Sequence, residues 1–341
     1  MDAVDSALER TPPKWRPVRR KRARHSKNLE PSSIAERAGP APALAPPRVD
    51  VTASRSIGRR ILGRAARSGG FRVGFVVLAL LVLAAALYPE LSGIDPAMRD
   101  IRARLLPPLF LGDKWSWAHP LGTDQIGRDM LVRCLVGLRY SLLIGVASVA
   151  VTVVIGCALG TVAGYFGGRT DTVIMRITDA QLSIPMIILA IAVLGADRPT
   201  IPAIILVLGL SNWPVYARVM RSVVMAERGR EYVRAAQVSG ATHPRIILTL
   251  LVPLLVPPLL FTSVLDVARM MIFESTLGFL GLGVQPPTPT FGSIIADGRK
   301  YLLNAWWIAT MPGVFLCLTL TGINLIGAAF ERARNSIHGG A

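Results

Sequence analysis

The chain has 341 residues, of which 52% are apolar, with a mean hydropathy of +0.47 and a formal net charge of +17. This composition is too hydrophobic for an average soluble domain, and because the apolar residues gather in long runs it indicates a polytopic membrane protein. The charge is unevenly placed, since residues 1–70 hold 16 Lys and Arg against 6 Asp and Glu, so we do not expect nucleic acid as a partner. Three cysteines without metal-type or paired spacing indicate no disulfide framework.

Residues 1–70 form a basic segment in which the run KWRPVRRKRARHSK precedes a Pro- and Ala-rich stretch. Such a composition cannot bury enough apolar surface to form a core, so we predict a disordered cytoplasmic tail. The basic run is either a solvated flank of the first membrane helix or a binding site for anionic lipid head groups or nucleic acid. The tail does not resemble a cleaved signal peptide, because no apolar core lies within about its first 30 residues.

Six stretches free of charged residues predict six transmembrane helices, because each is about as long as a helix needs to cross hydrocarbon. They are residues 73–89, 140–168, 180–196, 199–217, 246–265 and 301–330. The predicted fold class is therefore an all-α membrane protein. Its first helix and an external loop would occupy residues 71–139, and the other five helices residues 140–336.

Lysine and arginine in the short loops predict the orientation. Basic residues precede the first helix, follow the sixth, and lie between helices two and three and between helices four and five. We therefore expect both termini in the cytoplasm. The loop 89–139 is the exception, because it carries arginines on the predicted outer side.

The outer loop also contains an amphipathic pattern between residues 123 and 138. Thr123 is its expected N-cap, and Asp129 is spaced to pair with Arg133 four residues later. The pattern predicts a helix that either lies in the membrane interface or extends the second membrane helix.

The second external connection, residues 274–300, is rich in Gly and Pro and is expected to be irregular. Ile294 and Ile295 within it are expected to pack against the membrane face. The segment is either a gate or contact surface for an external partner, or a structured loop between two helices.

The sequence lacks the motifs of several catalytic and metal-dependent classes. It contains no G-x-x-x-x-G-K-[ST] phosphate loop, no H-E-x-x-H and no G-x-S-x-G, and its four histidines are scattered. We therefore predict that the chain is not an enzyme and has no catalytic residues, no metal site and no cofactor of its own.

Polar residues near the predicted membrane helices are the candidates for a transport pathway, since such groups are costly there unless they face a partner or water. Asp266 and Arg269 are three residues apart and can neutralise each other on one helix face. They either line a polar pathway, as in a self-sufficient secondary transporter or channel, or join neighbouring helices. Glu274, Asn212 and Asn324 are further candidates, although a lone Asn in a bundle usually joins helices.

Residues 231–253 form a polar, glycine-broken segment between apolar runs. Glu231 to Ser239 contains strong helix formers, and Gly240 suits the left-handed position that ends a helix. Thr242 followed by Pro244 can begin a second helix. The sequence therefore predicts a short helix, a sharp turn and a re-entry into the membrane, which together would form a docking device for another protein.

This segment, EYVRAAQVSGATHPRIILTLLVP, resembles the EAA loop of permease subunits of bacterial ABC importers. Ala235, Ala236, Gly240 and Pro253 match the pattern, whereas Arg234 stands where that family has glutamate. The motifs HPLGTDQIGRD, GYFGGRTD and FLGLGVQPPTPTFG look like those of the C-type permease of the dipeptide/oligopeptide/nickel importer group. The resemblance covers about residues 72–336.

The resemblance implies a type I ABC importer permease fold, with a cytoplasmic coupling helix between helices four and five, in the loop 227–253. It also implies a second, B-type permease, one or two ABC ATPase subunits that bind ATP and Mg, and an extracytoplasmic solute-binding protein. The complex would lie in the bacterial cytoplasmic membrane. Dipeptides or oligopeptides would be its substrate, with nickel, haem and glutathione as alternatives. The residues that contact the ATPase would be Glu231, Tyr232, Arg234, Ala235, Ala236, Gly240 and Pro253.

Overall fold

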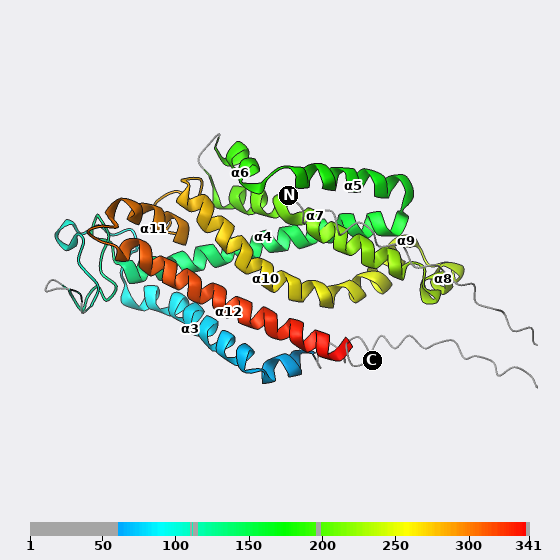
Figure 1. Ribbon diagram of the computed structural model, residues 1–341, viewed down its shortest axis with the longest axis horizontal. Helices are drawn as coiled ribbons and strands as arrows, with labels where there is room; N and C mark the ends of the chain where they lie inside the picture. Colours follow the sequence, from blue (N-terminus) through cyan, green and yellow to red (C-terminus); the bar gives the residue numbers. More distant parts are fainter. Residues whose placement is uncertain (1–60, 110, 112–114, 196–198, 339–341) are drawn as a thin grey trace, which may run out of the picture. The chain divides into compact units, whose positions relative to one another are not determined.

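The computed structural model describes residues 61–109, 111, 115–195 and 199–338, which lie within one compact unit. The regular structure of these residues is helical, apart from an isolated β-bridge between Thr123 and Asp129. The helices, labelled in Figure 1, are α3 (Gly69–Ser92), α4 (Met130–Phe166), α5 (Gly168–Ser183), α6 (Met186–Leu194), α7 (Ile201–Glu227), α8 (Glu231–Val238), α9 (His243–Ile246), α10 (Val252–Phe279), α11 (Phe291–Gly298) and α12 (Trp307–His338). Three short segments complete them: the 3-10 helices η1 (Ile101–Ala103) and η3 (Arg299–Tyr301), and the π-helix η2 (Ile247–Leu251).

Most of the predicted basic tail, residues 1–60, lies outside the described residues. Residues 61–67 are helical, although we predicted them to be disordered. Ile61 and Ala65 are each 1% exposed and pack against Ala333 of α12. Two apolar residues four apart share one helix face, and here that face is covered by a neighbouring helix.

The six predicted membrane spans are matched in part. Among the described residues, α3, α4, α7 and α12 are long and apolar enough to cross a membrane. The predicted span 180–196 covers the last turn of α5 and the whole of α6, two helices whose axes differ by 84° and which would together be a fifth span. The bend falls at Ile184, which is extended because the proline that follows disfavours helical geometry there.

The predicted span 246–265 is divided among three segments, α9, η2 and α10, and within the described residues it forms no single helix that is long and apolar enough to cross a membrane. Its second half continues into the part of α10 that carries Asp266, Arg269 and Glu274. By length and composition the described chain therefore has four spans, or five with the bent pair, where we predicted six.

The largest helix contact joins α4 to α7, which run in the same direction. Val151 of α4 lies against Gly209 of α7, and further along both helices Gly164 lies against Val224. Two parallel helices joined in sequence require a returning segment between them, and α5 with α6 provides it (Figure 1). The bent pair therefore brings the chain back along the bundle.

A row of glycines on α4 explains why the two helices come so close. Gly156, Gly160 and Gly164 recur every fourth residue on the face toward α7. A Cβ atom on Gly160 would lie 2.4 Å from the carbonyl oxygen of Ala217, so only hydrogen fits there. Small residues at this spacing let membrane helices pack backbone to backbone.

Helix α3 packs along α12 and is tied to α4 by an arginine (Figure 1). Pro89 lies inside α3 and has no N–H, so the carbonyl of Ala85 loses its usual helical partner. The Nε of Arg139 donates to that carbonyl, and its Nη2 donates to the oxygen of Ala86 at 3.0 Å. Arg139 thus satisfies the carbonyl that the proline leaves free.

The amphipathic pattern between residues 123 and 138 is resolved in favour of an extended membrane helix. Helix α4 begins at Met130, and the carboxylate of Asp129 caps it by accepting from the amide of Val132 at 2.8 Å. Residues 123–129 precede the helix, so the predicted N-cap at Thr123 is wrong.

Candidate functional site

The predicted helix and turn at residues 231–246 are present, as helices α8 and α9 with a glycine turn between them. Gly240 has a φ of 80°, in the left-handed region, as predicted. Its amide donates to the carbonyl of Gln237 at 3.0 Å, and the amide of Ala241 donates to that of Ala236 at 3.0 Å. This pair of bonds is a Schellman motif, which satisfies carbonyls at the end of α8. Helix α9 then begins with a proline in its first turn, again as predicted.

Helix α8 has one face toward the bundle and one toward solvent. Val233 is fully buried, and Ala236 packs beside it against a cluster that includes Tyr165 and Ile246. The exposed face consists of Glu231, Arg234, Ala235, Gln237 and Val238. Val238 is 89% exposed and was missed by the sequence interpretation, which instead placed both alanines on the outer surface.

A groove lies beside the glycine turn and continues the exposed face of α8. It has a volume of about 360 Å³ and is lined by residues of α8, the turn, α9 and η2, including Ser239, Gly240, Arg245 and Thr249. We call the exposed face of α8 together with this groove the α8–α9 surface. It offers small and apolar groups flanked by Arg234 and Arg245.

The start of α8 is joined to the end of α7. The hydroxyl of Tyr232 donates to Glu227 at 2.9 Å, and Arg230 lies 3.7 Å from the same carboxylate. Partial burial, together with the Glu227 hydrogen bond, raises the pKa of Tyr232 to about 12, so the hydroxyl stays a proton donor at neutral pH. Pro253, a predicted member of the loop, lies in the first turn of α10 beyond η2.

Of the polar candidates, Asp266 and Arg269 form the predicted ion pair. The Nη1 of Arg269 lies 3.1 Å from Asp266, whose side chain is 4% exposed. The carboxylate of Asp266 also accepts a hydrogen bond from the Tyr216 hydroxyl of α7, a partner that the sequence did not reveal. A carboxylate held by two donors from two helices joins α10 to α7, which favours the structural interpretation over an ion pathway.

Glu274, Asn212 and Asn324 have different surroundings from that pair. Glu274 is fully buried and accepts from the hydroxyl of Ser141 in α4 at 2.8 Å. Ser141 also accepts from the amide of Phe291 at 3.4 Å, so Glu274 belongs to a junction of α4, α10 and α11. The amide nitrogen of Asn212 is buried and has no hydrogen-bond partner among the described residues, and Asn324 is exposed on α12. The five candidates thus do not form one site.

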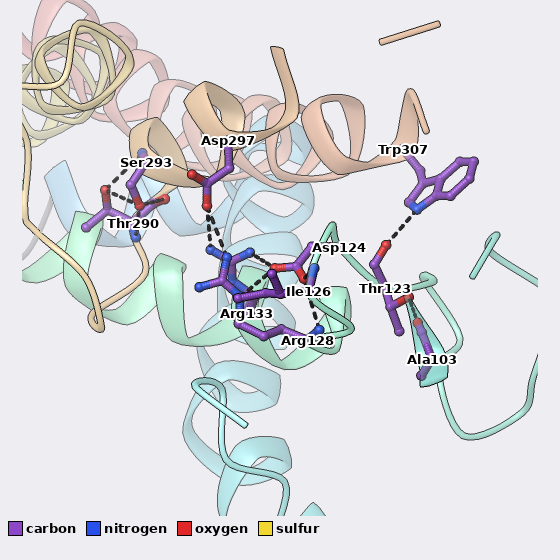
Figure 2. A network of polar contacts seen from close by, with 10 residues as sticks. All are labelled: Ala103, Thr123, Asp124, Ile126, Arg128, Arg133, Thr290, Ser293, Asp297 and Trp307. Carbon is purple, nitrogen blue, oxygen red and sulfur yellow. Dashed lines mark hydrogen bonds and ion pairs between the residues drawn. The ribbon is translucent and has the colours of Figure 1, made fainter. Parts of the chain in front are cut away.

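A ring of charged residues closes the opposite end of the bundle (Figure 2). Asp124 accepts from the Nε of Arg128 at 2.5 Å and from Arg133, while one oxygen of Asp297 lies 3.2 Å from Arg128 and 3.1 Å from Arg133. Two carboxylates are therefore shared by two guanidinium groups, and α11 is fastened to the start of α4. The predicted pairing of Arg133 with Asp129 is wrong, because Asp129 caps the helix instead.

Thr123 holds the same end of the bundle to α12 (Figure 2). Its hydroxyl accepts from the amide of Leu106 at 2.8 Å and donates to the carbonyl of Ala103. The indole of Trp307 donates to the carbonyl of Thr123 at 3.1 Å. No group of three or more His, Cys, Asp or Glu that could hold a metal ion occurs within the described ranges.

Comparisons with known proteins fit this arrangement. Residues 156–336 match the family model described as the binding-protein-dependent transport system inner membrane component. The "Probable D,D-dipeptide transport system permease protein DdpC" of Escherichia coli (strain K12) is 38% identical over 74% of this chain and 82% of its own. The di/tripeptide transport system permease protein DppC of Pseudomonas aeruginosa (strain UCBPP-PA14) is 35% identical over 79% of this chain and 88% of its own.

The nickel transport system permease protein NikC of Escherichia coli (strain K12) is 35% identical over 76% of this chain and 91% of its own. Among solved structures, the MetNI methionine ABC transporter in an inward-facing conformation is 20% identical, with a TM-score of 0.47, over 61% of this chain and 96% of that one. That structural similarity is too low to support a conclusion by itself. The family model and the sequence relatives suffice: the chain belongs to the binding-protein-dependent transport system inner membrane components and is a permease subunit of an ABC importer.

Proposed function

We propose that the chain forms half of the translocation pathway of a peptide importer, beside a second, B-type permease. The support is the set of similar permeases, which includes proteins named for D,D-dipeptide and for di/tripeptide transport. A relative named for nickel transport at 35% identity makes nickel the second candidate. Haem and glutathione stay as further alternatives within the same class.

We also propose that ATP is hydrolysed on separate subunits that dock on the α8–α9 surface. The observation that carries this proposal is Val238, an apolar side chain left 89% exposed at the end of a short helix that is otherwise anchored to the bundle. This apolar group lies on an exposed helix face that continues into a groove of about 360 Å³, so a partner that enters the groove would bury both together. The chain itself lacks a phosphate loop, so nucleotide and Mg would be held by the partner.

We propose an orientation from the end of the bundle at which the arginines gather. Helix α12 ends near Arg334, which lines a cavity with Val219 and Val223 of α7, so the ends of α12 and α7 lie at one level. The arginines concentrated at this level favour the cytoplasm for the α8–α9 surface and for both termini. Helix α10 would then be a further crossing, and the ring around Arg133 would face outward, where the solute-binding protein docks.

The docking proposal is tested by two charge substitutions in the full complex of permeases, ATPases and binding protein. Val238→Asp should reduce co-purification of the ATPases at least tenfold, because it buries a carboxylate in an apolar contact. Leu303→Asp is the matched control, since Leu303 is 98% exposed near the other end of α12 and should leave ATPase retention unchanged. Full retention by Val238→Asp would refute this docking surface.

The substrate proposal is tested by uptake in proteoliposomes that contain the complete complex. Dipeptides and tripeptides should drive ATP-dependent uptake and should stimulate ATP hydrolysis, whereas nickel, haem and glutathione should do neither. Uptake of nickel without uptake of peptides would identify nickel as the substrate. Uptake without ATPase subunits would instead support a self-sufficient transporter and overturn the importer mechanism.

A further inference from the structure

The end of α4 near α8 is attached to α9 by a contact between Tyr165 and His243, neither of which is among the residues predicted to contact the ATPase. The hydroxyl of Tyr165 and the Nδ1 of His243 are 2.8 Å apart, and their rings meet edge to face at 5.6 Å. Phe166 packs edge-on against both rings. Tyr165 is 8% exposed, so the contact forms a defined joint between the α4–α5 corner and the first residue of α9.

The corner that carries Tyr165 is itself tied to α7. One guanidinium nitrogen of Arg228 donates to the carbonyls of Gly164 and Tyr165, both at 3.1 Å. These carbonyls lie in the last turn of α4, where helical partners are missing. Asp171 in the first turn of α5 binds Arg221 of α7 with two hydrogen bonds, one of them 2.6 Å long. Helices α4, α5 and α7 are therefore fastened together at this end.

The connection from α9 to α10 is a continuous backbone segment, in contrast to the side-chain contact of Tyr165 with His243. Between them lies η2, a π-helical segment in which the amide of Val252 bonds to the carbonyl of Ile247, five residues earlier. A π segment within a helix is less regular than its flanks and often marks a point of bending. A displacement of α9 therefore meets a bendable link toward α10 and a direct hydrogen bond toward the α4–α5 corner.

We propose that Tyr165 and His243 are positioning residues for coupling, through which a displacement of the α8–α9 surface moves α4 and α5 together with α10. This inference rests on the proposed docking of an ATPase at that surface. Without the Tyr165–His243 bond, ATPase closure would bend η2 and move α10 alone. Hydrolysis would then continue while fewer solute molecules crossed.

The test uses the complete reconstituted complex and measures ATP hydrolysis and solute uptake on the same preparation, with an accepted peptide as the probe. Tyr165→Phe removes one hydroxyl and should lower the number of solute molecules transported per ATP about fivefold, the factor that a neutral hydrogen bond typically contributes. ATPase retention and thermal stability should stay near wild type. Tyr140→Phe is the matched control, because it removes the same group from the outer half of α4.

A second variant keeps the proposal testable if the first one loses stability. His243→Asn retains an amide near the position of Nδ1 and should restore part of the ratio that His243→Phe loses. The double variant Tyr165→Phe, His243→Phe should be no worse than His243→Phe alone, because both changes break one bond. A wild-type ratio in Tyr165→Phe, or losses that add in the double variant, would overturn the proposal.

Failure of ATPase docking and failure of the Tyr165–His243 joint give different results in these measurements. If the wild-type complex retains no ATPase, the proposed function is wrong and the joint falls with it. If the wild-type complex couples transport to hydrolysis and Tyr165→Phe does so equally well, only the joint is wrong.

Discussion

Gly240 shows how one residue can control the α8–α9 surface through its backbone alone. A Cβ atom there would meet nothing within 4 Å, so space is available for any side chain. The constraint is its φ of 80°, which costs a residue with a Cβ about 1–2 kcal/mol. The Schellman bonds at the end of α8 depend on this conformation.

We expect Gly240→Val to weaken coupling, because a β-branched residue resists left-handed geometry and would reorient α8 relative to α9. Uptake per ATP should fall while the permease still folds. Gly240→Asn is the control, since asparagine tolerates this conformation and should retain most uptake. Undiminished uptake by the valine variant would contradict the role given to the turn.

The side chain of Arg139 in α4 compensates for the backbone N–H that Pro89 lacks in α3. Arg139→Gln should destabilise the protein by about 1–3 kcal/mol, because the carbonyl of Ala85 would lose its donor. Adding Pro89→Ala restores a backbone N–H inside α3 and should recover part of that loss. Thermal unfolding of the four variants of this double-mutant cycle measures the coupling, and simple additivity would show that the two residues act independently.

At the scale of residues, the sequence predicted backbone conformations set by neighbouring residues, but it did not predict side-chain partners that lie far away in the chain. Gly240 was predicted in its left-handed turn because helix-forming residues precede it and a helix start follows. The partner of Arg133 was predicted wrongly, because the i,i+4 rule favoured Asp129 whereas the fold supplies Asp124 and Asp297. Asp297 lies on α11, and no periodicity relates it to α4.

At the scale of helices, the α4–α7 contact requires glycine at specific positions of α4. Gly160→Ala should destabilise the protein by about 1–3 kcal/mol or more, because the added Cβ would lie 2.4 Å from a backbone oxygen that cannot rotate away. Gly313→Ala in α12 is the matched control. Its Cβ would meet nothing within 4 Å, so it should gain about 0.5–1 kcal/mol. Thermal unfolding in detergent separates the two, and equal stability of both variants would contradict close packing.

The sequence predicted the helices better than their interruptions. Charge-free runs located α3, α4, α7 and α12 because hydrocarbon requires continuous apolar length. The 84° bend between α5 and α6 was missed, although Pro185 was its signal, because proline is tolerated in many membrane helices. The glycine row at residues 156, 160 and 164 was also visible in the sequence and would have predicted the face that α7 covers.

For the whole molecule, the contribution of the segment that precedes α3 can be tested by truncation. A chain that lacks residues 1–55 should assemble and transport, because it retains Ile61 and Ala65 against α12. A chain that lacks residues 1–70 should lose about 1.5–3 kcal/mol, the contribution of one buried isoleucine side chain. The measurements are the yield of the assembled complex and the thermal stability of each truncated chain, compared with the full-length chain. Loss of assembly on removal of 1–55 would show that the basic segment does more than flank the membrane.

The charged ring and the π segment lie at opposite ends of the bundle and differ in mechanical character. At the ring, two arginines hold two carboxylates whose charges cancel, so separating α11 from α4 there would leave Arg128 and Arg133 sharing the single carboxylate of Asp124, with one positive charge unmatched. At η2, bending requires no charge to leave its partner. A displacement of α8 would therefore be taken up by bending at η2 more readily than by separation of α11 from α4. If an ATPase docks on the α8–α9 surface as proposed, its movement would shift the helices more at that end of the bundle than at the end held by the Arg133 ring.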